Sequence, residues 1–145
     1  MAPKVNLYNS EGYFDPTAYQ AMTAVLKEQQ AKQIPFHPVV YICSPYAGDI
    51  DANVSAARRY SRFAVDRGFL PIAPHLLFPQ FLDDSKPEER ELGLFFGNVL
   101  MSKCVELWVF GEEISTGMRG EIERAKRKGY PIRYFTTGLE EKSRA

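Results

Sequence analysis

The sequence is poor in the residues that define metal-bound and disulfide-stabilised proteins. Its 145 residues include two cysteines, two histidines and one tryptophan. Neither Cys43 nor Cys104 has the closely spaced partners that a structural zinc site needs. We therefore expect two free thiols in a reducing cytoplasm, with neither a metal ion nor an organic cofactor.

Long apolar runs and an excess of one charge are also missing. No run of about 18 apolar residues is present, as a membrane-spanning helix would require, and the first residues lack the apolar core of a signal peptide. Eighteen basic and 18 acidic residues give a formal net charge of zero. Nucleic-acid polymers and anionic membranes usually select a basic excess. We therefore expect a cytoplasmic protein whose main partner is neither of these.

What the sequence does contain is typical of one globular domain with a short extension. Apolar residues make up 45% of the chain and charged residues 25%, which is ordinary for a soluble domain. Residues 1–14 look irregular, and Asp15 and Pro16 then mark the start of a helix, PTAYQAMTAVLKEQQAKQ. We predict an N-terminal extension with one helix over residues 1–37 and a single domain over residues 38–145.

Strand and helix patterns alternate from residue 38 onward. The strand patterns are VVYIC, FLPIAP, VELWVFG and PIRYFTT. The helix patterns are residues 53–68, with Asn53 or Asp51 as cap and Gly68 as the end, then residues 91–104 and 118–129; residues 75–90 read as a loop. Unbroken apolar strands suit a sheet that is covered on both faces. The alternation predicts an α/β, Rossmann-like (flavodoxin-like) domain with a mostly parallel sheet and helices on both faces.

Three loops of unusual composition follow the predicted strands: SPYAGD, APHLLFPQF and FGEEISTGM. In open parallel sheets, ligands bind beyond the carboxyl ends of the strands. We therefore expect these loops to form one binding edge.

The third loop leads into a helix with a carboxylate near its start. Ser115, Gly117 and Gly120 place small residues where free N–H groups and the helix dipole favour an anion, and Arg119 suits an anionic ligand. The dipole is expected to keep Glu121 ionised, and an ionised carboxylate can attack an anomeric carbon. Acidic residues are also ordinary near helix starts, so a purely structural role stays open.

The first loop offers Ser44, Tyr46, Gly48 and Asp49, which could hold a phosphate or a ribose hydroxyl. It has neither a dinucleotide fingerprint nor a P-loop pattern, and a simple tight turn is the alternative.

In the second loop, His75 could donate a proton to a leaving group or be a structural histidine. Phe78, Phe81 and Leu82 could stack on a planar base or pack beneath the loop.

The stretches VYICSPYAGD, GFLPIAPH and CVELWVFG, followed by ISTGMRGEIERAKRKGYPI, carry a resemblance to a known family. In this order they resemble the nucleoside 2-deoxyribosyltransferase-like superfamily, and in particular its small phage and bacterial branch, often described only as domains of unknown function. The resemblance covers about residues 38–136. It implies cleavage of an N-glycosidic bond, by hydrolysis or transfer, through a glutamate that attacks C1′ of a nucleoside or nucleotide.

The resemblance also implies roles for particular residues. Glu121 matches the nucleophile, and Ser115 matches a position that contacts the 5′-phosphate in the nucleotide hydrolases. Ser44, Tyr46 and Gly48 would hold phosphate or sugar. Sites of this superfamily are commonly completed by a neighbouring subunit, which implies a homo-oligomer.

The chain departs from the superfamily where an acidic residue normally stands on the helix before the third strand. Asn98 is the polar residue there, and Val105, followed by Glu106, replaces an acid that usually opens the third strand. Carboxylates at positions 83, 84, 88 or 89 are the available substitutes. The departure favours an alternative, a nucleotide-binding or sensor protein without catalysis. Two further alternatives are a glycosidase for ribonucleotides or a nicotinamide dinucleotide, and a structural oligomer.

Overall fold

The computed structural model describes residues 16–33 and 35–143, which fall into two units that divide between Phe36 and His37. The first unit contains α1 (Pro16–Gln33), which confirms the helix predicted for this segment. Tyr19 and Leu26 on α1 are exposed. The prediction that residues 1–14 are irregular lies outside the described residues.

The second unit contains a parallel sheet. Its described strands are β1 (Val39–Cys43), β2 (Leu70–Ile72), β3 (Glu106–Phe110) and β4 (Ile132–Phe135), in the order β2-β1-β3-β4. The connecting helices are α2 (Ile50–Asp66), α3 (Pro87–Met101) and α4 (Thr116–Lys128). All three pairings are parallel. This is the flavodoxin-like arrangement, in which the strand order reverses beside β1, so the predicted fold class is confirmed.

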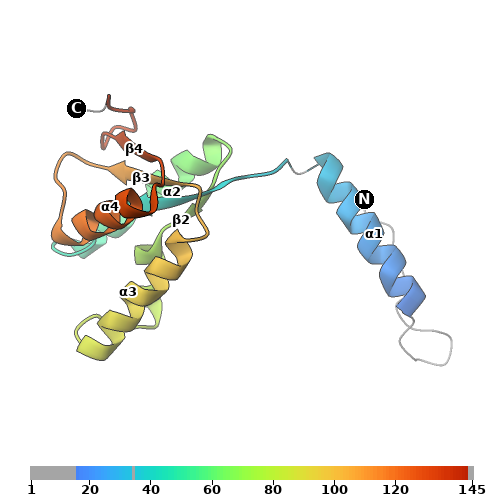
Figure 1. Ribbon diagram of the computed structural model, residues 1–145, viewed down its shortest axis with the longest axis horizontal. Coiled ribbons are helices and arrows are strands. Elements are labelled where there is room, and N and C mark those ends of the chain that lie inside the picture. The colour runs from blue at the N-terminus through green and yellow to red at the C-terminus, as the bar shows by residue number, and fades with distance from the viewer. Residues whose placement is uncertain (1–15, 34, 144–145) are drawn as a thin grey trace. The chain divides into compact units, whose positions relative to one another are not determined.

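Helices cover both faces of this sheet (Figure 1). Successive strand residues point to opposite faces. Val40 and Ile42 therefore pack with Trp108, Phe110 and Phe135 against Tyr60 and Ala64 of α2. Tyr41 and Cys43 face the other way, in a cluster that includes Met118, Ile122 and Ala125 of α4 and Met101 at the end of α3. Tyr41 and Cys43 are thus placed beneath α4, which follows a loop expected to bind ligands.

The start of α2 differs from the prediction. The helix begins at Ile50, and Asp49 is its cap because the Asp49 side chain accepts a hydrogen bond from the Ala52 N–H at 3.2 Å. The predicted caps, Asn53 and Asp51, are wrong. Gly48 has φ of 96°, a left-handed conformation that turns the chain immediately before Asp49. The Asn53 amide instead donates to the Tyr46 and Ala47 carbonyls, at 3.0 Å each, and so closes the first loop.

The start of α3 was also predicted too late. The helix begins at Pro87 rather than Glu91, because proline suits the first helical position, where its missing N–H costs nothing. The loop before α3 contains two short 3₁₀ turns, η1 (Pro74–Leu76) and η2 (Phe78–Gln80).

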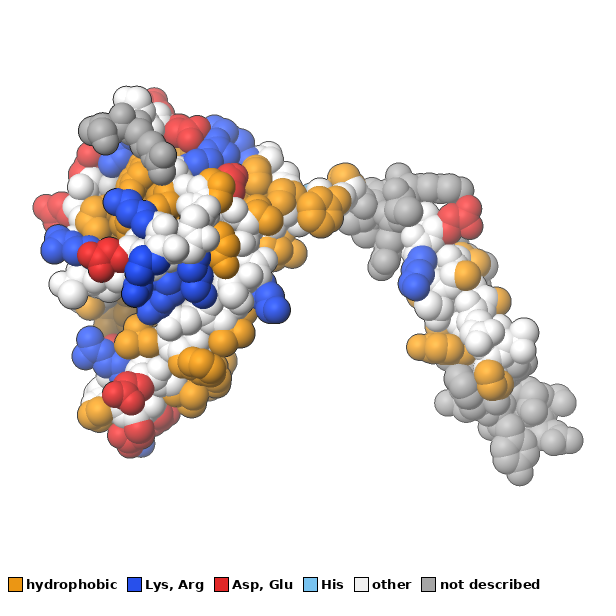
Figure 2. Space-filling model, in the orientation of Figure 1, with side chains coloured by type: hydrophobic (Ala, Val, Ile, Leu, Met, Phe, Trp, Pro, Cys, Tyr) orange, Lys and Arg blue, Asp and Glu red, His pale blue; other side chains and the backbone are white. Residues whose placement is uncertain are grey.

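An apolar surface lies along α3. Among the residues of this helix, Gly97 and Met101 are buried, whereas four large apolar side chains are exposed: Leu92, Leu94, Phe95 and Val99. Figure 2 shows apolar side chains at the surface over this helix. The homo-oligomer stays a prediction. It would give the exposed apolar side chains of α3 a partner, because a second copy of the chain could bury them.

Replacing Gly129 with alanine is expected to lower the free energy of unfolding by about 1 kcal/mol. Gly129 ends α4 with φ of 74°, a left-handed conformation that strains any residue with a Cβ atom. The matched control is Gly120→Ala, inside α4, where an added Cβ meets nothing within 4 Å. That variant is expected to gain about 0.5–1 kcal/mol from helix propensity. Urea unfolding measures both; equal effects would contradict the prediction.

Candidate functional site

The carboxyl of Glu121 lies at the predicted binding edge and is contacted by the first strand. Two side chains of β1 meet it from the face of the sheet beneath α4. The Cys43 thiol lies 3.8 Å from Glu121 Oε1, and the Tyr41 hydroxyl also donates a hydrogen bond to this carboxyl. Tyr41 and Cys43 are two residues apart on β1, so their side chains share one face of the sheet.

Neither partner of Glu121 was identified from the sequence, because both lie inside the apolar run VVYIC. Both are almost fully buried. The available signal was their spacing: tyrosine and cysteine are the two residues of this run whose side chains carry a hydrogen-bond donor, and they stand at alternate positions.

The environment of Glu121 changes its protonation. Burial raises the pKa of this carboxyl to about 7, although hydrogen bonds from Tyr41 and Cys43 and the positive charge of Arg124 oppose the rise. Burial therefore opposes the effect expected of the helix dipole, which was predicted to keep Glu121 ionised. Glu121 is the sixth residue of α4, and the dipole acts mainly within the first turn. Burial outweighs it, and at pH 7 the carboxyl divides between its two forms.

The donors beside Glu121 keep their protons throughout the physiological range. Burial raises the pKa of Tyr41 and of Cys43 well above their usual values, and the negative charge of Glu121 raises both further. Each group therefore stays a hydrogen-bond donor to the carboxylate rather than a competing nucleophile.

The start of α4 is open to a ligand. Ser115 is the N-cap, and its Oγ accepts from the Met118 N–H at 3.2 Å. An added Cβ at Gly117 would meet nothing within 4 Å, and Arg119 is exposed. The helix begins at Thr116, two residues before the predicted start. Thr116 and Gly117 in its first turn are exposed, whereas the Met118 and Arg119 N–H groups bond to Ser115; anion binding at this helix start stays a prediction.

The first two loops meet at the same edge. The Tyr46 ring stacks on the His75 ring, with centroids 4.9 Å apart and an angle of 25°. Burial lowers the pKa of His75, against the opposing charge of Asp84 and a hydrogen bond with the Ser44 backbone. The Ser44 side chain is 1% exposed, and its Oγ has no hydrogen-bond partner among the described residues. The predicted residues Ser44, Tyr46 and His75 therefore lie together.

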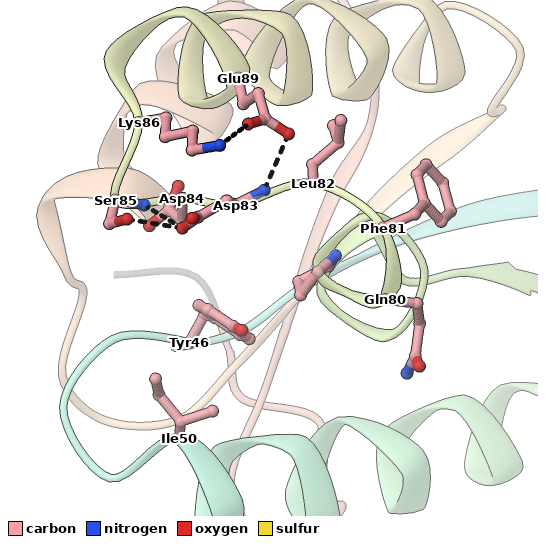
Figure 3. A pocket seen from close by; sticks show the side chains of 11 residues that line it. Tyr46, Ile50, Gln80, Phe81, Leu82, Asp83, Asp84, Ser85, Lys86 and Glu89 are labelled. Carbon is pink, nitrogen blue, oxygen red and sulfur yellow. Dashed lines mark hydrogen bonds and ion pairs between the residues drawn. The ribbon is translucent and has the colours of Figure 1, made fainter.

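A cavity of about 560 Å³ opens beside Tyr46. Tyr46 and Ile50 form one wall, and residues 79–86 with Glu89 form the other (Figure 3). Two of its acidic side chains are engaged within the loop. Asp83 accepts from the Ser85 N–H at 3.0 Å, and Glu89 accepts from the Asp83 N–H at 3.2 Å while lying 3.6 Å from Lys86.

Glu121, Ser115 and Arg119 do not line this cavity. It adjoins their edge of the sheet through Tyr46, whose ring stacks on His75. Phe81 and Leu82 are among the lining residues. Phe81 also packs edge-on against Phe78, with ring centroids 6.0 Å apart, and Phe78 packs on Phe96, with centroids 5.5 Å apart.

Asn98 and Glu106, the polar residues at or beside the two positions where the resemblance predicted an acid, lie apart from each other. Asn98 is half-buried on α3, directly after Gly97, where an added Cβ would meet the Tyr41 hydroxyl at 3.4 Å. Glu106 begins β3, at the opposite edge of the sheet, and lies 3.8 Å from Arg133. Asp83, Asp84 and Glu89 are the acidic residues that the structure places at the cavity.

Fold and site together define a flavodoxin-like α/β domain with a partly buried glutamate beside the carboxyl ends of its strands. Comparison with known families places the chain more narrowly. Residues 38–135 match the family described as a domain of unknown function (DUF7768), and the chain belongs to it.

Among solved structures, the chain is similar to a 2-deoxyribosyltransferase from Bacillus psychrosaccharolyticus. The two sequences are 15% identical, the TM-score is 0.58, and the match covers 68% of this chain and 72% of that chain. This likeness shows a shared fold and agrees with the resemblance found in the sequence. No curated protein matches the sequence.

Two further features are absent from residues 16–33 and 35–143, the part of the chain that the structure describes. No helix there combines the length and apolar character needed to cross a bilayer. No group of three or more histidine, cysteine, aspartate or glutamate side chains is placed there to hold a metal ion. The cytoplasmic location stays a prediction.

Proposed function

We propose that the protein binds a nucleoside or nucleotide and cleaves or exchanges its N-glycosidic bond with Glu121 as the nucleophile. The observation that carries this proposal is the Glu121 carboxyl, held by Tyr41 and Cys43 beside the carboxyl ends of the strands. A carboxyl in this setting is fixed in direction and only weakly solvated, which favours attack on a nearby carbon. The fold shared with a 2-deoxyribosyltransferase supports the same reaction class.

The reaction takes two steps. A Glu121 oxygen attacks C1′ of the sugar and forms an ester, while the C1′–N bond breaks and its electron pair leaves with the base, which takes up a proton. Water or a second base then attacks C1′ and releases the carboxylate. A 2′-deoxyribosyl centre suits a site with one carboxylate, because its oxocarbenium-like transition state is reached without the electron-withdrawing 2′-hydroxyl.

The remaining residues suggest how the substrate lies. The exposed start of α4, with Ser115, Gly117 and Arg119, suits a 5′-phosphate. The cavity beside Tyr46, with Phe81 and Leu82 in its wall, has room and apolar surface for a base. Burial lowers the pKa of His75, so its ring is neutral at pH 7. We therefore propose His75 as a hydrogen-bond donor to the departing base rather than as an imidazolium acid.

A nucleotide-binding protein without catalysis is the second candidate. Asn98 favours it, because an amide stands on α3 where the related enzymes carry an acid, and an amide can neither accept nor supply a catalytic proton. Among the carboxylates at the cavity, Asp83 and Asp84 precede α3 and Glu89 lies in its first turn, so none of them stands at the position of Asn98.

Chromatography of reaction mixtures separates the two candidates. The purified protein is incubated with each 2′-deoxynucleoside and its 5′-monophosphate, with and without a second free base, beside ribonucleotides and nicotinamide adenine dinucleotide. Free base or exchanged nucleoside from the 2′-deoxy compounds is expected. Nucleotide-dependent thermal stabilisation without turnover would establish the binding protein instead, and neither turnover nor binding at millimolar concentration would reject both.

The rate of base release is expected to rise with pH until about pH 7 and then level off. Attack requires the ionised form of Glu121, and burial raises the pKa of this carboxyl to about 7. Below that value, each pH unit removes about nine-tenths of the ionised form, so kcat/KM falls about tenfold per unit. The profile is measured between pH 5 and 9 under conditions where the protein stays folded. A rate that is constant or falls from pH 5 to pH 7 would contradict the assignment.

A further inference from the structure

Cys43 is placed to respond to the charge of Glu121. Its sulfur lies 3.8 Å from Glu121 Oε1 and 3.9 Å from the carbonyl oxygen of Met118. A thiol has one proton, so a stronger hydrogen bond to one of these acceptors weakens the bond to the other. Cys43 is 0% exposed, so its thiol is shielded from bulk solvent.

The two acceptors differ in how they respond to protonation. The Met118 carbonyl is a neutral backbone group at every pH. The Glu121 oxygen is a strong acceptor when the carboxyl is ionised, because hydrogen bonds to a charged group are about twice as strong as neutral ones. It becomes a weaker acceptor once the carboxyl is protonated or forms an ester with C1′ of a sugar.

We infer that Cys43 is a positioning residue whose thiol donates to Glu121 Oε1 when the carboxyl is ionised and to the Met118 carbonyl when the carboxyl is neutral. The thiol thereby holds the attacking oxygen in the ionised state and releases it in the neutral one. The exchange on protonation is inferred from the two contacts of the thiol and does not require the proposed function. The exchange on formation of a glycosyl ester rests on the proposed function.

Other groups near the carboxyl do not duplicate this exchange. Tyr41 contributes a hydrogen bond from the same strand, and Arg124 acts on Glu121 from α4 through its charge. Cys104 acts electrostatically on Tyr41. From α3, the residue against the Tyr41 hydroxyl is Gly97, which carries no titratable group. Cys43 is the member of this set for which the structure gives a second, neutral acceptor.

The S–H stretching band in the infrared spectrum tests the inference without any substrate. The Cys43 band, assigned by its loss in Cys43→Ala, is expected to shift as pH rises from 5 to 9, with a midpoint near 7, and to stay fixed in Glu121→Gln. Cys104 is the internal reference, because its thiol donates to the Leu100 carbonyl at 3.3 Å, an acceptor that does not titrate. A Cys43 band that stays fixed while the Glu121 carboxyl band titrates would overturn the inference.

A second measurement examines the effect on Glu121 itself. The thiol lowers the pKa of the carboxyl, so Cys43→Ala is expected to raise the midpoint of the Glu121 carboxyl band by roughly half a unit, since a thiol is a weak donor. Cys43→Ser, which keeps a donor, is expected to restore the midpoint. An unchanged midpoint in Cys43→Ala would count against the inference. Both infrared bands are measured without turnover. If the bands shift as expected but the protein cleaves no nucleoside, the missing cleavage refutes the proposed function, and the hydrogen-bond exchange of Cys43 is still supported.

Discussion

In the Glu121→Gln variant, base release from a 2′-deoxynucleoside is expected to fall by about 10⁴-fold. Glutamine has nearly the shape of glutamate, and its amide oxygen can still accept the hydrogen bond from Tyr41. It has no negative charge and a poorly nucleophilic amide oxygen, so the ester with C1′ does not form. The loss is expected in kcat rather than in KM, because the substrate contacts at the start of α4 and at the cavity are unchanged. Single-turnover chromatography measures it.

Glu123 provides the matched control for this loss. It lies two residues further along α4 and is exposed, and the structure gives it no contact with Tyr41 or Cys43 among the described residues. Glu123→Gln removes the same charge from the same helix and is expected to keep base release within a factor of two to three of the unaltered protein. Retention of activity in Glu121→Gln to within tenfold would show that the nucleophile lies elsewhere.

The same Glu121→Gln substitution is expected to raise the free energy of unfolding at pH 8 by about 3 kcal/mol. The pKa of Glu121 is about 7 in the folded protein, against an ordinary value of 4.5. The folded state therefore binds more protons than the unfolded state between these values, and stability falls as pH rises from about 4.5 to about 7. Glutamine avoids this cost, because it imitates the protonated carboxyl.

The pH dependence identifies the cause. At pH 4, where the carboxyl is protonated in the folded state and mostly protonated in the unfolded state, Glu121→Gln and the unaltered protein are expected to have nearly equal stability. The difference grows through pH 5 and 6 and is nearly constant above pH 7. Urea unfolding at these pH values measures it, with Glu123→Gln as the reference. A difference of the same size at pH 4 and pH 8 would mean that packing, not ionisation, separates glutamate from glutamine at this position.

Together these two predictions describe a carboxylate that is needed for base release and that lowers the free energy of unfolding above pH 7. A glutamate with a purely structural role at a helix start would normally stabilise the helix through the dipole. Glu121 instead lies beyond the first turn and is partly buried against two donors of β1. This opposition between stability and ionisation is common where a side chain performs chemistry.

Much of the fold was predictable because local patterns carry it. The apolar runs VVYIC and VELWVFG predicted strands buried on both faces, and their alternation with helices predicted the parallel sheet. Where prediction was wrong, a local feature had been misjudged. Pro87 was placed in the loop predicted over residues 75–90, although proline at a first helical position starts α3. Asp49, directly after the left-handed Gly48, caps α2 before the residues that had been expected to do so.

The candidate site was also predictable only in part. The sequence by itself determined that loops of unusual composition follow β1, β2 and β3, and that Glu121 follows a turn of small residues at the start of a helix. Parallel strands bring their carboxyl ends to one edge, so these loops had to meet. The contact between Tyr46 and His75 is the clearest example.

Only the tertiary structure decided which groups surround Glu121. Cys43 and Glu121 are 78 residues apart in the chain, and the sequence pattern of β1 shows that residues 41 and 43 share a face without showing which helix residue lies opposite them. That choice depends on how α4 packs across β1 and β3. The same packing removes water from the carboxyl, and its raised pKa is a consequence of burial that no local sequence pattern contains.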